Sequence, residues 1–197
     1  PFLKVALMVG ATPPTRFADI VVEWMARGAA ERGDFQLEIL DLREAVLPFL
    51  DEPIPPSLLA GNYATPEANI WRSRLGKCDG YIVTVAEYNH GPTAVLKNAF
   101  DSACNEWVRK PIAFVGYGNS GGTRAIEQLR SVAVGLQMAP LHHEVNIHHD
   151  MHMAVANGEK RLDDYANLCG ARTEMFDNLV WWTGALRTAR NKLRLVR

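Results

Sequence analysis

The feature that most constrains the fold of this 197-residue sequence is a pair of short apolar runs, residues 81–85 and 111–115. Uninterrupted apolar runs of this length are typical of strands that are buried on both faces of a parallel sheet. A polar, turn-rich loop follows each run, at residues 87–91 and 116–122, and a helix-like pattern begins directly after each loop. In open α/β sheets, ligands with phosphate groups bind where such loops join a strand to a helix N-terminus.

The rest of the chain continues this alternation of strands and helices. Residues 2–9 predict a central strand, and an amphipathic helix starts near Phe17 with Thr15 as its N-cap. Alternating side chains over residues 35–39 predict a second, more exposed strand. Further helices are predicted over residues 66–78, 94–107, 123–135 and from 162 onward, with a fifth strand over 138–147. Residues 42–63, with four prolines, and the polar residues 148–158 predict loops.

Five strands alternating with five helices predict an α/β protein, a three-layer α/β/α sandwich formed by one domain over residues 1–197. Right-handed crossovers with helices on both faces favour a five-stranded parallel sheet. Its expected order is the flavodoxin-like 2-1-3-4-5.

Composition excludes several classes of partner. The formal net charge is −1, so neither nucleic acid nor an acidic membrane surface is predicted to bind. No run of 18 apolar residues is present, as a membrane-spanning helix requires. Three scattered cysteines without a CxxC pair are typical of reduced thiols. We therefore expect a cytoplasmic protein.

The first loop, GATPPTRF at residues 10–17, contains groups that suit a phosphate monoester. Thr12 and Thr15 provide hydroxyls, Arg16 provides a guanidinium, and the helix that follows provides its positive end. The loop is not GxGxxG and lacks the lysine of a Walker loop, so a dinucleotide or NTPase motif is not indicated. An ordinary capped helix start with an exposed arginine would contain the same kinds of residue. This loop alone therefore does not distinguish a phosphate site from a structural helix start.

The other two loops suit a planar ligand. Tyr88 can lie beside a flat ring, while Asn89 and nearby backbone N–H groups bind its heteroatoms. Four glycines in GYGNSGG allow backbone N–H groups to approach a ring closely. A simple left-handed turn is the structural alternative. Three such loops at one edge of a sheet favour ligand binding.

The motifs EYNHG, VLKNAFD, KP and GYGNSGGTRAIEQLR resemble the NADPH-dependent FMN reductase family. This family includes quinone, azo-dye and chromate reductases of flavodoxin-like fold. Residues 10–16 align without gaps to its common first loop, G-S-T-R-P-G-R, and the LPFLDEP run at residues 47–53 matches the segment after its second strand. The resemblance covers most of the chain.

The resemblance implies FMN as cofactor and NADPH or NADH as hydride donor. Electrons would pass through FMN to a small-molecule acceptor such as a quinone, an azo compound or a metal oxyanion. The residues expected around the FMN phosphate are Thr12, Thr15, Arg16 and Phe17. Those expected to flank the flavin ring and ribityl chain are Glu87, Tyr88, Asn89 and His90. Those expected to approach the isoalloxazine are Gly118, Asn119, Ser120, Gly121 and Gly122.

Three positions depart from the family pattern. Pro13 stands where the family often has an arginine, Ala11 replaces a serine, and Ala86 replaces a proline. The first two departures are expected to weaken FMN affinity. They motivate an alternative function, a non-catalytic flavin-binding or flavin-free regulatory module. No catalytic side chain is predicted, because the flavin carries the electron chemistry and Ser120 does not lie in a GxSxG motif.

Histidines provide a competing signal. Five of them fall within eleven residues, at His142, His143, His148, His149 and His152. A metal-dependent hydrolase is the third hypothesis, but no HExxH order is present and no metal site is predicted. Ordinary hydrogen bonding, or a place beside the substrate pocket of a neighbouring subunit, is expected instead. The adjacent Trp181 and Trp182 cannot both face the core, which indicates a homodimer or homotetramer interface.

Overall fold

The computed structural model describes residues 2–59 and 61–195, and a parallel sheet forms its centre. The strands run in the order β2-β1-β3-β4-β5, with β6 paired to β4 beyond the short β5. This confirms the predicted order. The strands are β1 (Leu3–Val9), β2 (Phe35–Asp41), β3 (Gly80–Ala86), β4 (Pro111–Tyr117), β5 (Ala139–Pro140) and β6 (Val145–Ile147).

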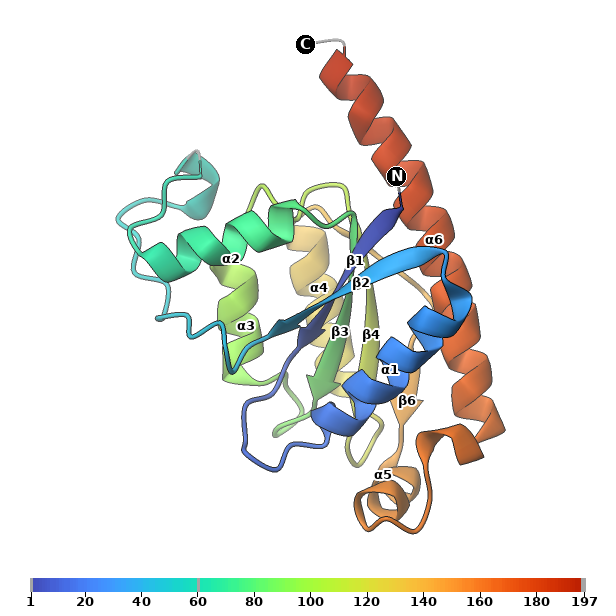
Figure 1. Cartoon of the computed structure of the whole chain (residues 1–197). Coiled ribbons are helices and arrows are strands. Elements are labelled where there is room, and N and C mark those ends of the chain that lie inside the picture. The colour runs from blue at the N-terminus through green and yellow to red at the C-terminus, as the bar shows by residue number, and fades with distance from the viewer. Residues whose placement is uncertain (1, 60, 196–197) are drawn as a thin grey trace.

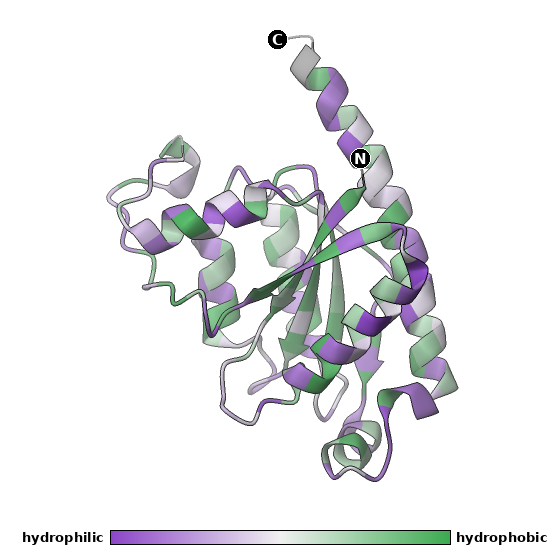
Figure 2. Ribbon diagram, viewed as in Figure 1, coloured by the Kyte–Doolittle hydropathy of each residue, from purple (hydrophilic) through white to green (hydrophobic). Residues whose placement is uncertain are grey.

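Helices cover both faces of the sheet, which explains the apolar runs. On one face lie α1 (Ala18–Arg32) and α6 (Ala166–Leu195); on the other lie α2 (Pro66–Gly76), α3 (Ala94–Asp101) and α4 (Thr123–Gly135) (Figure 1). Side chains of β1 alternate between the two cores: Val5 and Leu7 join the α1 side, whereas Ala6 and Met8 join the α2 side. The central strands are accordingly green, or hydrophobic, along most of their length in Figure 2.

The predicted fifth strand is divided into two. Residues 141–144 leave the sheet between β5 and β6, so each piece pairs with a different part of β4. Arg130 of α4 holds this bulging segment: its guanidinium donates to the Leu141 carbonyl at 2.6 Å and to the Glu144 carboxylate at 2.5 Å. The fifth position in the sheet is therefore correct, but its continuity is not.

Three local predictions were wrong. The expected loop at residues 148–158 contains helix α5 (His149–Ala156), which Val155 anchors in the core. Helix α3 ends at Asp101, six residues earlier than expected, although Trp107 is still fully buried. Thr15 does not cap α1: Phe17 occupies the cap position, and no side chain caps the helix.

The long segment between β2 and α2 is irregular, as predicted, apart from a short 3-10 helix η1 (Pro56–Leu58). It carries several exposed apolar side chains, including Phe49, which is 77% exposed. A second 3-10 helix, η2 (Leu162–Asp164), precedes α6. No helix in the described part of the chain is long and apolar enough to cross a membrane.

The loops after β1, β3 and β4 all lie at the carboxyl edge of the sheet, at the bottom of Figure 1. Helix α5 lies at the same edge. Because parallel strands all end at one edge, segments that are far apart in the sequence are brought together there. The predicted site loops therefore have a helix as an unexpected neighbour.

Candidate functional site

A hollow of about 490 Å³ lies between the loops after β3 and β4 and helix α5. We call it the loop pocket. It brings together five of the predicted residues and four that were not predicted. The predicted ones are Glu87, Asn89, His90, Gly118 and Asn119; the others are Arg124, His149, His152 and Met153.

The loop after β3 is a tight turn with unusual backbone conformations. Tyr88 and Gly91 exchange two backbone hydrogen bonds of 2.9 Å, and both residues between them have positive φ, 51° at Asn89 and 70° at His90. Two left-handed residues between a bonded pair form a type I′ turn, which non-glycine residues adopt at a cost. Backbone strain of this kind is concentrated at functional sites, where it holds side chains in the orientation that a ligand requires.

The loop after β4 requires its glycines. Gly118, Gly121 and Gly122 have φ values of 134°, 64° and 74°. A Cβ added at Gly122 would lie 2.7 Å from Gly116 Cα, and one at Gly121 would lie 2.8 Å from Asn146 Cβ. These residues therefore present bare backbone at the carboxyl edge, as the sequence predicted. Ser120 lies in the same turn, where its carbonyl accepts a bond from the Thr123 N–H.

A salt bridge joins the two loops. Arg124, at the start of α4, donates from Nε to Glu87 Oε1 at 2.6 Å, and its backbone N–H donates to Oε2 at 3.1 Å. Arg124 Nη1 also lies 2.8 Å from His90 Nε2. Burial raises the pKa of Glu87, but the bonds and the charge of Arg124 outweigh it, so the net pKa is below the usual value. Glu87 is thus an ionised bridge between the loops.

In the first loop, Arg16 is already engaged by carboxylates. Its guanidinium binds both Asp41 oxygens, one of them at 2.7 Å, and Nε donates to Asp19 at 2.8 Å. The hydrogen bonds from Arg16 lower the pKa of Asp41. The Arg16 side chain is only 4% exposed. Arg16 also donates to the Ala11 carbonyl at 2.7 Å, so its buried side chain stabilises the first loop.

Arg43, in the segment after β2, was missed by the sequence analysis. Its guanidinium donates to the carbonyls of Thr12, Pro13 and Pro14, at 3.2 Å from Thr12 and 3.1 Å from Pro14. In a planar trans peptide, the carbonyl and the N–H point in opposite directions. The Pro14 carbonyl accepts a bond from Arg43, so the Thr15 N–H of the same peptide points away from Arg43. The sequence did contain a signal for Arg43. It follows the strand β2, which lies beside β1, so its position is at the same edge of the sheet as the first loop.

Several backbone donors at the first loop make no hydrogen bond to the described residues. In the part of the chain that the structure describes, the backbone N–H groups of Thr15, Phe17 and Ala18 donate no hydrogen bond. The α1 N-terminus also lacks a side-chain cap. Uncapped N–H groups at a helix start bind anions.

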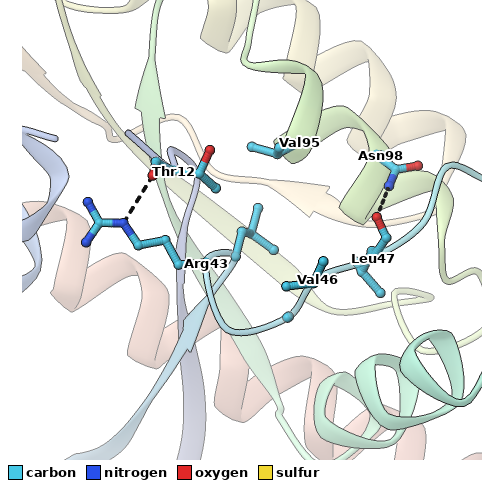
Figure 3. Close-up of a pocket in the computed structure, with 8 residues that line it drawn as sticks. Thr12, Arg43, Val46, Leu47, Val95 and Asn98 are labelled. Atoms are coloured by element: carbon cyan, nitrogen blue, oxygen red, sulfur yellow. Dashed lines mark hydrogen bonds between the residues drawn. The ribbon is translucent and has the colours of Figure 1, made fainter. Parts of the chain in front are cut away.

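A second hollow, of about 350 Å³, lies beside this loop (Figure 3). Apolar residues of the segment after β2 line it, including Val46 and Leu47, with Val95 of α3 above them. Arg43 and Asn98 fix its rim through bonds to Thr12 and Leu47. This second hollow borders Thr12 of the first loop.

Four of the five clustered histidines form two separate pairs. His142 and His143 precede β6 and contact each other, with ring centroids 5.2 Å apart, whereas His149 and His152 line the loop pocket. His148 packs its ring against Gly121. Among the described residues, no three His, Cys, Asp or Glu side chains are arranged to hold a metal ion. The pocket histidines belong to the same chain as the loops.

Tyr117, at the end of β4, has an unusual hydroxyl. Its ring is 5% exposed and packs against Phe17 of the first loop at 5.2 Å between centroids. The hydroxyl is buried but finds no hydrogen-bond partner among the described residues. Buried hydroxyls are nearly always bonded. Its partner therefore has to come from a water molecule or from a ligand group next to the first loop.

Comparison with known proteins agrees with this geometry. A family model described as NADPH-dependent FMN reductase matches residues 3–152, which include all three loops. An NAD(P)H-dependent FMN reductase of Schizosaccharomyces pombe is 31% identical over 135 residues, 68% of this chain and 68% of that protein. LOT6, an NAD(P)H-dependent FMN reductase of Saccharomyces cerevisiae, is 28% identical over 145 residues, 69% of this chain and 76% of that protein.

Solved structures support the fold. FerB, a flavoenzyme NAD(P)H:(acceptor) oxidoreductase from Paracoccus denitrificans, superposes with a TM-score of 0.72 at 22% identity, over 93% of this chain and 98% of that one. An NAD(P)H:quinone oxidoreductase from Methanothermobacter marburgensis gives 0.64 at 16% identity, over 88% and 97%.

Proposed function

The chain belongs to the NADPH-dependent FMN reductase family, and from this membership we infer that it is an NAD(P)H-dependent FMN oxidoreductase. The observation that carries the inference is that the family match spans residues 3–152, and these contain the three loops at one sheet edge. No observation favours a non-catalytic or flavin-free module. We propose a small acceptor, such as a quinone, an azo compound or a metal oxyanion.

The residues at the carboxyl edge fit FMN. A phosphate needs hydrogen-bond donors, and the first loop has unpartnered N–H groups at an uncapped helix start. A flat ring needs bare backbone nearby, and Gly118, Gly121 and Gly122 provide it. The unpaired Tyr117 hydroxyl needs a polar partner, and a flavin phosphate or ribityl chain has suitable oxygens. These three features lie around one edge of the sheet.

In this proposal Thr12, Thr15 and the N–H of Phe17 hold the phosphate. Arg16 and Arg43 keep the loop in the conformation that presents those groups, because their guanidinium donors are directed at Asp41 and at the loop carbonyls. The charges of Arg16 and Arg43 are balanced by Asp19 and Asp41, so the site binds phosphate mainly through hydrogen bonds and the helix end.

The loops after β3 and β4 hold the ring in this proposal. Tyr88, Asn89 and His90 project from the strained turn, and Gly118, Asn119, Ser120, Gly121 and Gly122 approach from the other side. Glu87 keeps the two loops at a fixed separation through Arg124. Bound FMN supplies two-electron transfer from NAD(P)H to the acceptor. The chain orients both substrates in the loop pocket and limits access of water.

We also propose that residues 1–197 form one domain, that the protein acts in the cytoplasm, and that it assembles as a homodimer or homotetramer. Exposed apolar side chains support the assembly: Val46 is 71% and Phe49 is 77% exposed on the segment after β2, and Trp181 of α6 is 66% exposed. Soluble monomers seldom expose so many large apolar groups close together on one segment.

FMN binding tests the proposed function directly. Titration of the purified protein into FMN should quench or shift flavin fluorescence with saturation at one FMN per chain. The complex should then oxidise NADPH in the presence of menadione. Absence of saturable FMN binding would overturn the function and leave only the fold.

A further inference from the structure

Helix α5 adds two histidines to the loop pocket, beside the loops after β3 and β4. His149 and His152 line the loop pocket together with Glu87, Asn89 and His90. The helix lies at the carboxyl edge because Val155 packs into the core beneath it. The imidazoles therefore line the same pocket in which the proposed function places the flavin ring with the acceptor beside it.

His152 is held in a defined position. Its ring lies 4.2 Å from the Phe17 ring and 5.8 Å from the Tyr117 ring, measured between centroids. These contacts come from the start of α1 and the end of β4, so two independent elements fix the imidazole. A half-buried ring that is packed in this way loses little further freedom when it binds a ligand.

Three of the other polar side chains of the pocket are already paired with one another. Arg124 binds Glu87 and contacts His90 Nε2, so these three side chains satisfy one another. In the described part of the chain, the imidazole nitrogens of His149 and His152 make no hydrogen bond. Their donors are therefore available to a ligand in the loop pocket.

We propose that His152, with His149 beside it, donates a hydrogen bond and then a proton to a carbonyl oxygen of a quinone-type acceptor. This proposal rests on the proposed function. NAD(P)H provides two electrons and one proton, whereas reduction of a quinone to a hydroquinone consumes two electrons and two protons. The second proton comes from the His152 imidazolium, and water restores it afterwards. General acids of this kind contribute roughly 10²- to 10⁴-fold to rates.

The surroundings of His152 set the pH dependence. The titratable and charged groups that face it are His149 on its own helix, Tyr117 on β4, and Glu87, His90 and Arg124 across the pocket. Burial, and next the neighbouring His149, lower the pKa of His152. The proton-donating form is therefore lost as pH rises through a value below about 6.5. Quinone reduction should slow over the same range.

Two acceptors separate proton donation from electron transfer. Menadione needs protons when it is reduced, whereas ferricyanide accepts one electron and no proton. In His152→Gln the ratio of kcat/KM for menadione to that for ferricyanide should fall at least tenfold, and in His149→Gln it should fall less. The matched control is His142→Gln, an exposed histidine outside the pocket, in which the ratio should stay within twofold.

A measurement without turnover complements this test. Resorcinol carries two ring hydroxyls, as a hydroquinone does, but their meta arrangement prevents oxidation to a quinone. Its addition to the FMN-loaded protein should shift the NMR resonances and the pKa of His152, but not those of His142. In wild type, the menadione rate should fall with rising pH while the ferricyanide rate does not.

The proposal is overturned if His152→Gln lowers both acceptor rates equally, or if the menadione pH profile is the same in wild type and variant. An unchanged His152 resonance with resorcinol would also contradict it. Failure of the proposed function has a different signature, since wild type would then reduce neither acceptor.

Discussion

Arg124 and Glu87 connect the two loops that follow β3 and β4, with Arg124 Nε 2.6 Å from Glu87 Oε1. The carboxylate side chain is 3% exposed, while the guanidinium is 41% exposed. The buried partner therefore depends on the exposed one for its charge. This bridge holds the strained turn at Asn89 and His90 against the glycine loop.

Loss of this bridge should weaken flavin binding. Glu87→Gln removes the charge but keeps the shape, so we expect FMN affinity to fall about tenfold and unfolding free energy by about 1.5–3 kcal/mol. Fluorescence titration and urea unfolding measure the two quantities. Glu106→Gln is the matched control, because Glu106 is also nearly buried, at 9% exposure, and pairs with Arg72 away from the loops. It should lose stability but retain FMN affinity.

Arg16 is expected to act through its carboxylate partners. Arg16→Ala leaves Asp41, at 17% exposure, without its buried cation, which should cost about 3 kcal/mol of unfolding free energy. The loop then loosens, and FMN affinity should fall at least tenfold. Arg27→Ala is the control: its bridge to Asp163 is half exposed and should be worth at most about 1 kcal/mol. Equal losses in both variants would contradict this role.

The ion pair between Arg16 and Asp41 predicts that the stability of the protein falls in acid. Hydrogen bonds from Arg16 lower the pKa of Asp41 in the folded protein. Because the folded pKa lies below the unfolded value of about 3.9, the ionised pair stabilises the fold above that pH, and the stabilisation is lost as pH falls through the folded pKa. Melting temperatures between pH 6 and pH 2.5 should therefore drop less steeply in Asp41→Asn than in wild type. Parallel curves would show that the pair does not contribute.

Much of this architecture could be predicted from sequence because it follows from simple regularities. The apolar runs of β3 and β4 predict buried parallel strands, and the loops that follow them fall at one edge. Helix α5 could not be predicted, because HDMHMAVA buries only Val155 and shows no apolar stripe. The partners of Arg16 could not be predicted either: Asp41 is 25 residues away and meets Arg16 only because β2 lies beside β1.

The glycines of the third loop should not tolerate side chains. Gly122→Ala places a methyl group 2.7 Å from Gly116 Cα at a φ of 74°, so the loop must shift, with a loss of at least about 1–3 kcal/mol. FMN affinity should fall with it. Gly184→Ala, in α6, meets nothing within 4 Å and should stabilise the protein by about 0.5–1 kcal/mol. Thermal unfolding and FMN titration of the two variants provide the comparison.

The segment after β2 should carry the assembly. Phe49→Asp places a charge on a side chain that is 77% exposed, and it should convert the oligomer to monomers at micromolar concentration in sedimentation velocity. Phe2→Asp, at 60% exposure and at the other end of the sheet, should leave the oligomer intact. A monomeric wild type, or dissociation by both substitutions, would contradict the assignment of this surface.

An anaerobic absorption spectrum of the protein with one equivalent of FMN tests whether the chain is a working FMN oxidoreductase. We expect a flavin band that differs from that of free FMN, that NADPH bleaches and that menadione restores. A spectrum identical to free FMN, unchanged by NADPH, would show that the chain has the fold of its family without its activity.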